Sequence, residues 1–271
     1  MSPPDRSKGE YQPGQHEGSS PQGKLLLVPN TLDFGVAGDA DLQEVLPLSV
    51  IRTAARLTYW VAENAKTTRA FLKRVDAIAP LARPLQELSI IELPRPVKGS
   101  RLSAPHDLKP LLQPALQGHD IGLISEAGLP AVADPGAALV QAAHEMKLGV
   151  TALPGPSSLL LALAASGLNG QSFAFVGYLP VEAAERAARV RELEALSKRS
   201  AQTQLMIETP YRNEALLAAL LAHLRGDTLL SVSCGLTLLQ AWTRTDVVAQ
   251  WKASPARMPA DIPAVFSLLA R

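Results

Sequence analysis

The sequence predicts an α/β fold, with helices packed on sheets and right-handed crossovers between strands. The main observation is that short apolar runs alternate along the chain with segments of helical periodicity. The run at 120–125, Asp-Ile-Gly-Leu-Ile-Ser, is typical of a parallel strand buried on both faces. Aromatic residues make up only 4% of the chain, and alanine and leucine supply most of its apolar content. This composition favours helices on a sheet over an aromatic-rich β-sandwich.

The first half of the chain carries an alternating series of expected elements. The stretch at 1–23 is rich in Pro, Gly, Ser and Gln, and we expect it to be a disordered tail. Strands are expected at 24–29, 57–62, 120–125 and 150–154. Helices are expected at 48–56, 63–75, about 107–117 and 137–147. Residues 79–105 contain five prolines and give no clear element.

A similar alternation follows residue 170. Strands are expected at 173–178, 203–208, 228–234 and 264–269. Helices are expected at 182–199 and 214–224. The simplest division is an N-terminal α/β domain at 24–155 and a C-terminal α/β domain at 156–271, which meet near Pro154–Ser158.

Bulk properties narrow the class of protein. The formal charge of +1 argues against a nucleic-acid footprint over the whole surface but allows a local basic patch. The single cysteine, Cys234, lies in an apolar strand pattern and suits a reducing compartment. The five histidines have no partner at metal-ligand spacing, so we expect no metal site. No apolar run approaches the roughly 20 residues that cross a bilayer, and no signal peptide is visible, so we expect a cytoplasmic protein without membrane contact.

Three loops that follow expected strands concentrate the groups able to bind a ligand. In Ser125–Gly136, small residues let a ligand lie against the backbone at the carboxyl end of a buried strand, and Asp134 predicts the start of a helix. Leu153–Ser158 is stiffened by prolines, and its two serines can cap a helix or bind a ligand. Ile207–Asn213 gathers a glutamate, a tyrosine, an arginine and an asparagine in one turn. Each loop is also compatible with an ordinary strand–helix connection.

The sequence lacks Gly-x-Gly-x-x-Gly, Walker A and Gly-x-Ser-x-Gly motifs, which disfavours a dinucleotide site, a P-loop and a hydrolase elbow. Taken in order, its loops instead resemble the tetrapyrrole-methylase superfamily, and most of all the branch of small-subunit rRNA 2′-O-ribose methyltransferases. That branch carries Ser-Asp-Ala-Gly-x-Pro…Asp-Pro-Gly, Leu-Pro-Gly-Pro, Gly-aromatic-Leu-Pro and Tyr/Ile-Glu-x-x-x-Arg. The matching segments here are Ser125–Gly136, Leu153–Pro156, Gly177–Pro180 and Glu208–Arg212. The resemblance runs from about residue 24 to the C-terminus.

The resemblance implies a two-domain tetrapyrrole-methylase-like fold, a homodimer, and S-adenosylmethionine bound in a cleft between the domains. It implies cofactor-binding residues in loops of both domains, with Pro29–Thr31 facing the same cleft. From the N-terminal domain these residues are Pro29, Ser125, Glu126, Ala127 and Gly128. From the C-terminal domain they are Ser157, Ser158, Met206, Glu208, Gly235, Leu236, Pro263 and Ala264.

The chain departs from the pattern of that branch at several places. Val28–Gly35 stands where the branch has Thr-Pro-x-Gly-Asn-Leu, and Ala62–Lys66 reads Ala-Glu-Asn-Ala-Lys in place of Ala-Glu-Asp-Thr-Arg. Glu126 replaces the aspartate of Ser-Asp-Ala-Gly, and Gly235–Gln240 lacks a charged Arg-Glu-Leu-Thr-Lys segment. These differences indicate a divergent sister group.

Methyl transfer depends mainly on positioning and water exclusion, and a hydroxyl acceptor also benefits from a base. We hypothesise that Glu126 or Glu208 accepts the proton, that Glu63 is a further candidate, and that Arg212 orients an anionic substrate. The first hypothesis is an RNA methyltransferase with a basic cluster on the first domain. Its members are Arg52, Arg56, Lys66, Arg69, Lys73 and Arg74. A small-molecule, tetrapyrrole-like methyltransferase and a non-catalytic cofactor-binding dimer are the alternatives.

Overall fold

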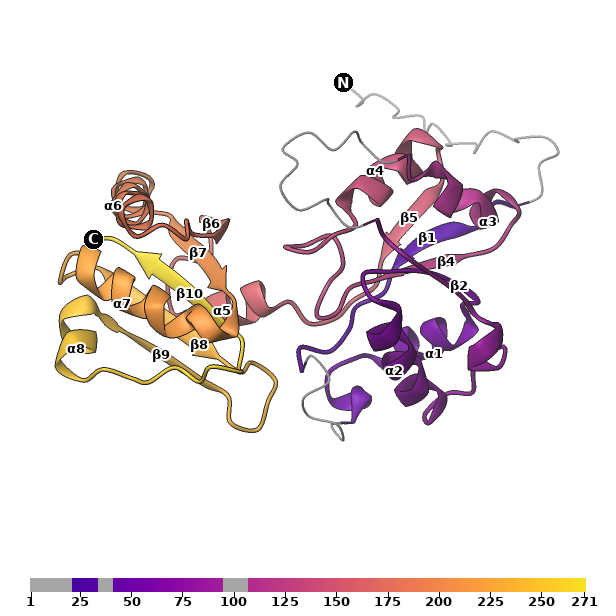
Figure 1. Cartoon of the computed structure of the whole chain (residues 1–271), viewed down its shortest axis with the longest axis horizontal. Helices are drawn as coiled ribbons and strands as arrows, with labels where there is room; N and C mark the ends of the chain where they lie inside the picture. The colour runs from indigo at the N-terminus through magenta and orange to yellow at the C-terminus, as the bar shows by residue number, and fades with distance from the viewer. Residues whose placement is uncertain (1–20, 34–40, 95–106) are drawn as a thin grey trace, which may run out of the picture.

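The computed structural model describes residues 21–33, 41–94 and 107–271. These residues form two five-stranded sheets, one in each half of the chain (Figure 1). The expected N-terminal tail lies outside the described residues up to residue 20. The α/β class and the two-domain architecture are therefore confirmed.

The first sheet is parallel throughout, with the strand order β3-β2-β4-β1-β5. Its strands are β1 (Lys24–Leu27), β2 (Tyr59–Ala62), β3 (Ser89–Glu92), β4 (Ile121–Ile124) and β5 (Gly149–Ala152). All four residues of the central strand β4 are buried, as the apolar run at 120–125 predicts. Strand β3 lies in the proline-rich stretch at 79–105, where no element was expected.

Helices cover both faces of the first sheet. Helices α1 (Leu48–Arg56) and α2 (Ala65–Asp76) lie on one face, and α3 (Gln113–Leu116) and α4 (Ala137–Glu145) lie on the other. Neighbouring strand residues point to opposite faces, so Leu26 packs with α1 and α2 whereas Leu25 packs with α3 and α4. Short 3₁₀ turns occur at Leu42–Glu44, Leu85–Glu87 and Lys109–Leu112.

The helix expected at about 107–117 is only partly present. A 3₁₀ turn precedes a single turn of α-helix, and each of them has a proline at its start, Pro110 and Pro114. A proline removes a backbone N–H donor, so a continuous helix through both positions is disfavoured.

The second sheet is mixed, with the strand order β6-β7-β10-β8-β9. Its strands are β6 (Phe173–Tyr178), β7 (Thr203–Glu208), β8 (Leu229–Cys234), β9 (Trp242–Val247) and β10 (Ala264–Leu269). Only β6 and β7 pair in parallel, and the other three pairs are antiparallel. The second half is thus no structural repeat of the first, although the alternation of elements is similar.

Helices α6 (Ala183–Ser200), α7 (Asn213–His223) and α8 (Val248–Ala253) cover one face of the second sheet, and α5 (Ser158–Ser166) covers the other. Phe266 and Trp251 lie fully buried in the larger core, and Cys234 lies there too, as the sequence predicts. Burial raises the pKa of the Cys234 thiol. Strand β9 and helix α8 were not expected.

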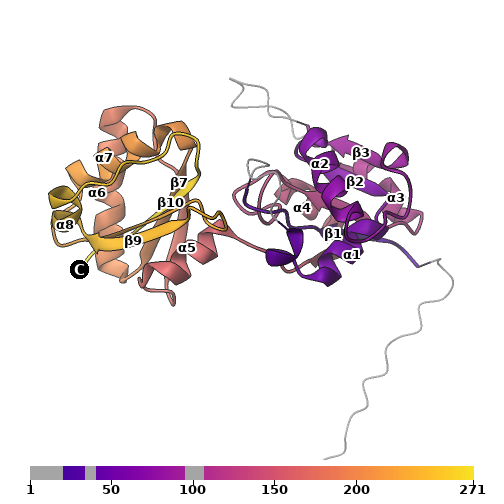
Figure 2. The same ribbon diagram turned by 90° about the horizontal axis from the view of Figure 1, so that it is seen from below.

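Residues 153–157 connect β5 to α5, and the two halves lie side by side in both views (Figures 1 and 2). Among the described helices, none combines the length and the apolar character that crossing a bilayer demands. The domain limit at 155 and 156 stays a prediction.

Candidate functional site

A cavity of about 520 Å³ lies between the two halves of the chain, and segments that follow strands of both sheets line it. The carboxyl ends of parallel strands meet at one edge of a sheet, so the loops after β1, β2 and β4 come together there. In the second sheet, β10 runs antiparallel to β7 and β8. Its first residue, Ala264, therefore pairs with Glu208 and Cys234 at their carboxyl ends.

Most of the sequence-predicted cofactor residues line this cavity. They come from both halves of the chain, as the family resemblance implies. They are Glu126, Ala127, Gly128, Ser157, Ser158, Glu208, Gly235, Leu236, Pro263 and Ala264. Ser157 is the N-cap residue of α5, but its side chain makes no capping hydrogen bond, so capping does not account for its hydroxyl.

Three of the predicted cofactor residues do not line the cavity. Pro29 lies directly against the backbone of Gly155, and Leu32 lines the cavity in its place. Ser125 is 3% exposed and lies behind the wall, and its hydroxyl has no partner among the described residues. Met206 is fully buried in the core because alternate residues of β7 point to opposite faces, and Ile207 lines the cavity instead.

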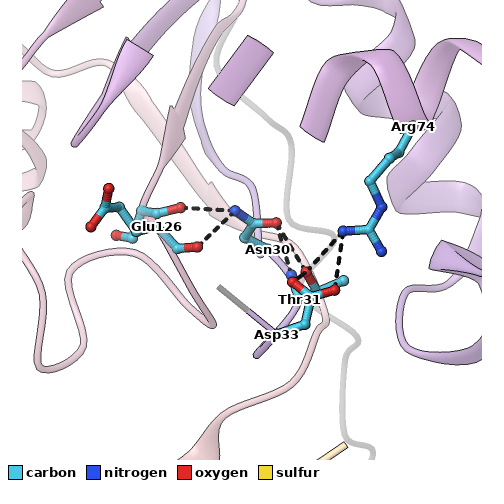
Figure 3. A network of polar contacts seen from close by, with 6 residues as sticks. Asn30, Thr31, Asp33, Arg74 and Glu126 are labelled. Carbon is cyan, nitrogen blue, oxygen red and sulfur yellow. Dashed lines mark hydrogen bonds and ion pairs between the residues drawn. The ribbon is translucent and has the colours of Figure 1, made fainter. Parts of the chain in front are cut away.

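The loop after β1 is fastened to the loop after β4 by Asn30 (Figure 3). The Asn30 side-chain amide donates hydrogen bonds to the carbonyl oxygens of Ser125 and Glu126, at 3.2 Å and 3.0 Å. Its backbone N–H donates to the Gly128 carbonyl at 2.9 Å, which forms an isolated antiparallel bridge. Asn30 is 6% exposed and thus positions one wall of the cavity from behind.

The same loop is held from the other side by α2. The Thr31 hydroxyl donates to Asp33 Oδ1 at 2.7 Å, and Arg74 of α2 pairs with Asp33 Oδ2 at 3.1 Å (Figure 3). Arg74, one of the cations of the expected basic cluster, is therefore engaged in supporting the loop.

Glu126 is held by two hydrogen bonds, one accepted by its carboxylate and one donated by its backbone. Asn64 Nδ2 donates to Glu126 Oε1 at 2.8 Å, and the Glu126 backbone N–H donates to Glu63 Oε2 at 3.0 Å. Asn64 and Glu126 are two of the positions at which the chain departs from the rRNA-methyltransferase pattern, which has an aspartate at each. The two changes are complementary, since an amide donor now faces a carboxylate acceptor.

Glu208 is also engaged. It is 7% exposed, its Oε2 lies 3.2 Å from Arg212 Nη2, and its Oε1 accepts from the backbone N–H and the hydroxyl of Thr209 at 2.8 Å and 3.2 Å. Arg212 lies beside the cavity and is not one of its lining residues. The positive charge of the Arg212 guanidinium balances the negative charge of the Glu208 carboxylate.

Asp134 has a different place from the one predicted. Helix α4 begins at Ala137 with Gly136 at the N-cap and no side-chain capping bond, so Asp134 does not start the helix. Its carboxyl lines the cavity instead. Burial, and secondly the charges of Glu63 and Glu126, raise the pKa of Asp134 to about 7. The Asp-Pro-Gly motif carried the signal, but a capping role explained it equally well.

Tyr178 is a cavity residue that the sequence indicated only as part of a motif. The pairing of β6 with β7 shifts register between Phe175 and Tyr178, and Gly177 has a φ of 73°. A bulge of this kind redirects a side chain, and glycine adopts the left-handed conformation without strain. Tyr178 lines the cavity and is 59% exposed. Partial burial of its hydroxyl in the cavity, and the charges of Asp134, Glu208 and Glu63, raise the pKa of Tyr178.

The lining suits S-adenosylmethionine in size and chemistry. Its volume of about 520 Å³ falls within the range of roughly 300–1,000 Å³ typical of small-molecule sites. None of the described lining residues is a lysine or an arginine, so the carboxylates favour a ligand with positive charge. The carboxylates that line the cavity are Glu63, Glu126, Asp134, Glu208 and Asp261. Apolar side chains offer a surface for a flat ring system, namely Leu32, Leu129, Val132, Ile207, Leu236 and Val265.

The backbone at Gly128 is open to a ligand. Its φ of 67° is left-handed, and an added Cβ would lie 3.2 Å from Leu32 Cδ2 and 3.6 Å from the Pro156 carbonyl oxygen. Any side chain here would be strained and would enter the space that a ligand needs. In the described part of the chain, no group of three or more His, Cys, Asp or Glu side chains is arranged to hold a metal ion.

Comparison with known sequences identifies relatives. The family model of tetrapyrrole (corrin/porphyrin) methylases matches residues 48–240. Three proteins named ribosomal RNA small subunit methyltransferase I are similar to this chain. That of Mesorhizobium japonicum is 40% identical over 47% of this chain and 42% of that protein. That of Bacillus subtilis is 36% identical over 61% and 56%, and that of Streptococcus pyogenes serotype M6 is 30% identical over 74% and 60%. The aligned part thus spans about two fifths to three fifths of these relatives.

Solved structures share the fold. The methyltransferase CobJ superposes with a TM-score of 0.56 at 15% identity, over 92% of this chain and 94% of that one. Uroporphyrin-III C-methyltransferase from Thermus thermophilus gives a TM-score of 0.50 at 17% identity, over 91% and 92%. With the family match across most of the chain and the cavity between two such domains, the protein belongs to the tetrapyrrole (corrin/porphyrin) methylases.

Proposed function

We propose that this protein is an S-adenosylmethionine-dependent methyltransferase that acts on RNA, with a ribose 2′-hydroxyl as the acceptor. Members of its family and its rRNA methyltransferase relatives use S-adenosylmethionine as methyl donor. The observation that carries the proposal is the cavity, whose carboxylates, small-residue loop and apolar patches match a cationic nucleoside. When bound, the cofactor supplies an activated methyl group.

The chain's own residues then bind, orient and exclude water. The backbone of Ala127 and Gly128 and the hydroxyls of Ser157 and Ser158 line one side of the proposed cofactor site. The other side is formed by the segments at 235–236 and 263–264. Ser125, behind the wall, supports the loop.

The names of the relatives favour RNA as the substrate, and the charge distribution supports it. Lys66, Arg69 and Lys73 are exposed and follow one another at helical spacing on α2. Helix α2 begins next to the cavity, because its N-cap residue Asn64 also donates to Glu126. Arg52 and Arg56 are exposed on α1, which packs against α2. An RNA backbone on this outer face would neutralise these cations.

Glu126 and Glu208 stay candidates for the proton acceptor, with Arg212 holding Glu208. Replacing each glutamate by glutamine and measuring turnover tests them. We further propose that the protein forms a homodimer in the cytoplasm. Light scattering of the purified protein tests the dimer by its mass, and a monomer at micromolar concentration would contradict it.

The first experiment measures binding of S-adenosylmethionine and S-adenosylhomocysteine by calorimetry, with the Gly128→Val variant as control. We expect binding by the natural protein and binding at least about tenfold weaker by the variant, whose folding is checked by circular dichroism. Transfer of a radiolabelled methyl group to small-subunit rRNA then tests the acceptor. Binding followed by transfer only to a tetrapyrrole would replace RNA as the substrate. Binding without transfer to either would favour a non-catalytic dimer.

A further inference from the structure

Among the described residues, Asp134 is the partly buried carboxyl group of the cavity wall that makes no hydrogen bond or ion pair with the protein. Resting on the methyl transfer proposed above, we propose that Asp134 is the catalytic base of this enzyme, accepting the proton that the acceptor hydroxyl loses. It is therefore the residue whose replacement should disable the chemistry rather than the binding of either substrate.

The contacts of the other carboxylates set Asp134 apart. Glu126 accepts from Asn64, Glu63 accepts from the Glu126 backbone, and Glu208 is paired with Arg212. Within the part of the chain that the structure describes, no hydrogen bond or ion pair engages the Asp134 carboxyl, although it lines the cavity. A hydrogen bond or ion pair stabilises the ionised carboxylate and so makes it a weaker base, and of these four only Asp134 makes no such contact. The fifth carboxylate of the lining, Asp261, makes none either, but it is exposed to solvent.

The backbone around Asp134 is held in a costly conformation. Ala131 and Ala133 have φ angles of 66° and 63°, in the left-handed region that residues with a Cβ seldom adopt. An ordinary helix start would turn the aspartate toward the first amides of α4, whereas here Gly136 occupies the N-cap. Strain of this kind persists where the surrounding structure enforces it, and it concentrates at functional sites. Here it accompanies a carboxyl group that lines the cavity.

The groups that face Asp134 come from four segments. Glu63 follows β2, Glu126 follows β4, Tyr178 ends β6 and Glu208 ends β7, and all of them line the same cavity. Burial and the charges of Glu63 and Glu126 raise the pKa of Asp134 to about 7. A base works best when its pKa is near the working pH, because it is then both partly ionised and strongly basic.

The proposed step balances in atoms and charge. The acceptor oxygen forms the new bond to the methyl carbon while the carbon–sulfur bond of the donor breaks, and the electron pair of that bond stays on sulfur. The hydroxyl proton passes to the Asp134 carboxylate, which becomes neutral and later releases the proton to solvent. The positive charge on sulfur and the negative charge on Asp134 are lost together, so the net charge of the cavity is the same before and after the step.

The kinetic test compares Asp134→Asn, Asp134→Glu and, as a control, Asp227→Asn. Asp227 is exposed and does not line the cavity, so its replacement makes the same chemical change away from the site. We expect Asp134→Asn to lower kcat about 100-fold and to abolish the rise of kcat with pH around neutrality, with KM nearly unchanged. Asp134→Glu should recover part of the rate and keep the pH dependence. Asp227→Asn should leave kcat within about 3-fold of the natural value, since it removes an exposed charge outside the site.

Two outcomes would overturn the assignment. One is turnover by Asp134→Asn within about 3-fold of the natural protein, and the other is loss of the pH dependence in Glu126→Gln or Glu208→Gln but not in Asp134→Asn. If the natural protein transfers no methyl group to any acceptor, the proposed function itself fails and the base assignment with it.

A second readout is independent of activity. Carbon-13 NMR of the side-chain carboxyls in the full chain, with the Asp134 signal assigned by its loss in Asp134→Asn, follows the titration directly. We expect a midpoint of about 7. A midpoint at the ordinary value of 3.8 would show that the carboxyl is not poised to accept a proton and would overturn the proposal.

Discussion

Replacing Asp134 by asparagine should stabilise the fold at alkaline pH and leave its stability unchanged in acid. The pKa of this carboxyl is raised in the folded protein from 3.8 to about 7, mainly by burial. The unfolded chain therefore loses the proton at lower pH than the folded protein does. The free energy of unfolding should fall as the pH rises from about 4 to about 7 and then stay level, because the folded state must carry a poorly hydrated charge.

The size of the effect follows from the shift. At about 1.36 kcal/mol per pKa unit, the whole shift from 3.8 to about 7 would correspond to a loss of about 4 kcal/mol in the free energy of unfolding. Asp134 is only partly buried, so solvent screens the unfavourable term, and we expect about 1–2 kcal/mol above pH 7.5. For a chain of this size that corresponds to a rise in Tm of roughly 3–6 °C.

Thermal and urea unfolding of the natural protein, Asp134→Asn and Asp261→Asn at pH 4.5 and pH 8.0 provide the measurement. The gain in stability should be confined to Asp134→Asn at the higher pH. The exposed Asp261 is hydrated in the folded and the unfolded protein alike, so its replacement should not change the stability. If Asp134→Asn is no more stable than the natural protein at pH 8.0, the ionised carboxylate does not destabilise the folded state. Burial of the Asp134 carboxyl would then not explain a raised pKa, and the proposed role of this residue would lose that support.

Three further predictions concern the cofactor, the RNA and the cavity mouth. Gly128→Val places a β-branched side chain at a φ of 67° with its Cβ about 3.2 Å from Leu32, so affinity for S-adenosylmethionine in calorimetry should fall at least about tenfold; full affinity would exclude this loop from the site. Charge reversal at Lys66 and Arg69 should weaken RNA binding and lower the salt slope by at least about 1, without changing cofactor affinity; an unchanged slope would remove α2 from the RNA surface. Tyr178→Ala should raise KM for RNA about tenfold through loss of a stacking surface whereas Tyr178→Phe should not, and equal effects of the two would point to the hydroxyl.

The sequence could predict the elements whose signal is local. Strands β6, β7 and β10 begin and end at the expected residues, because apolar runs of β-forming residues are bounded there by turn residues. Strands β3 and β9 were missed because their apolar pattern is weak. Strand β3 lies within the proline-rich stretch at 79–105, and β9 carries four polar or charged residues in succession at 243–246. The antiparallel pairing of β10 was equally invisible, since register and direction are settled by contacts between distant segments.

The same distinction applies to the site. Loops such as Ser125–Gly136 could be located from their motifs, because a small-residue turn after a buried strand is a local pattern. Met206 was expected to line the cavity, but its neighbour Ile207 lines it instead. A difference of one position along a strand exchanges one face of the sheet for the other. The place of Asp134 in the cavity wall could not be predicted from sequence, since an aspartate before a proline is also a common way for a helix to begin. Only the tertiary structure, with Gly136 taking the cap, separates the two possibilities.

The near-neutral charge of the chain is compatible with an RNA substrate because opposite charges are separated in space. The formal net charge is +1, yet the described lining of the cavity carries five carboxylates and no lysine or arginine. Lys66, Arg69 and Lys73 lie outside it on α2. A phosphate would be repelled by the cavity and attracted to the helix, whereas a cationic donor and an uncharged hydroxyl can both enter. This arrangement holds the RNA backbone at the surface while the acceptor group alone reaches the chemistry, so net charge by itself is a poor guide to the substrate.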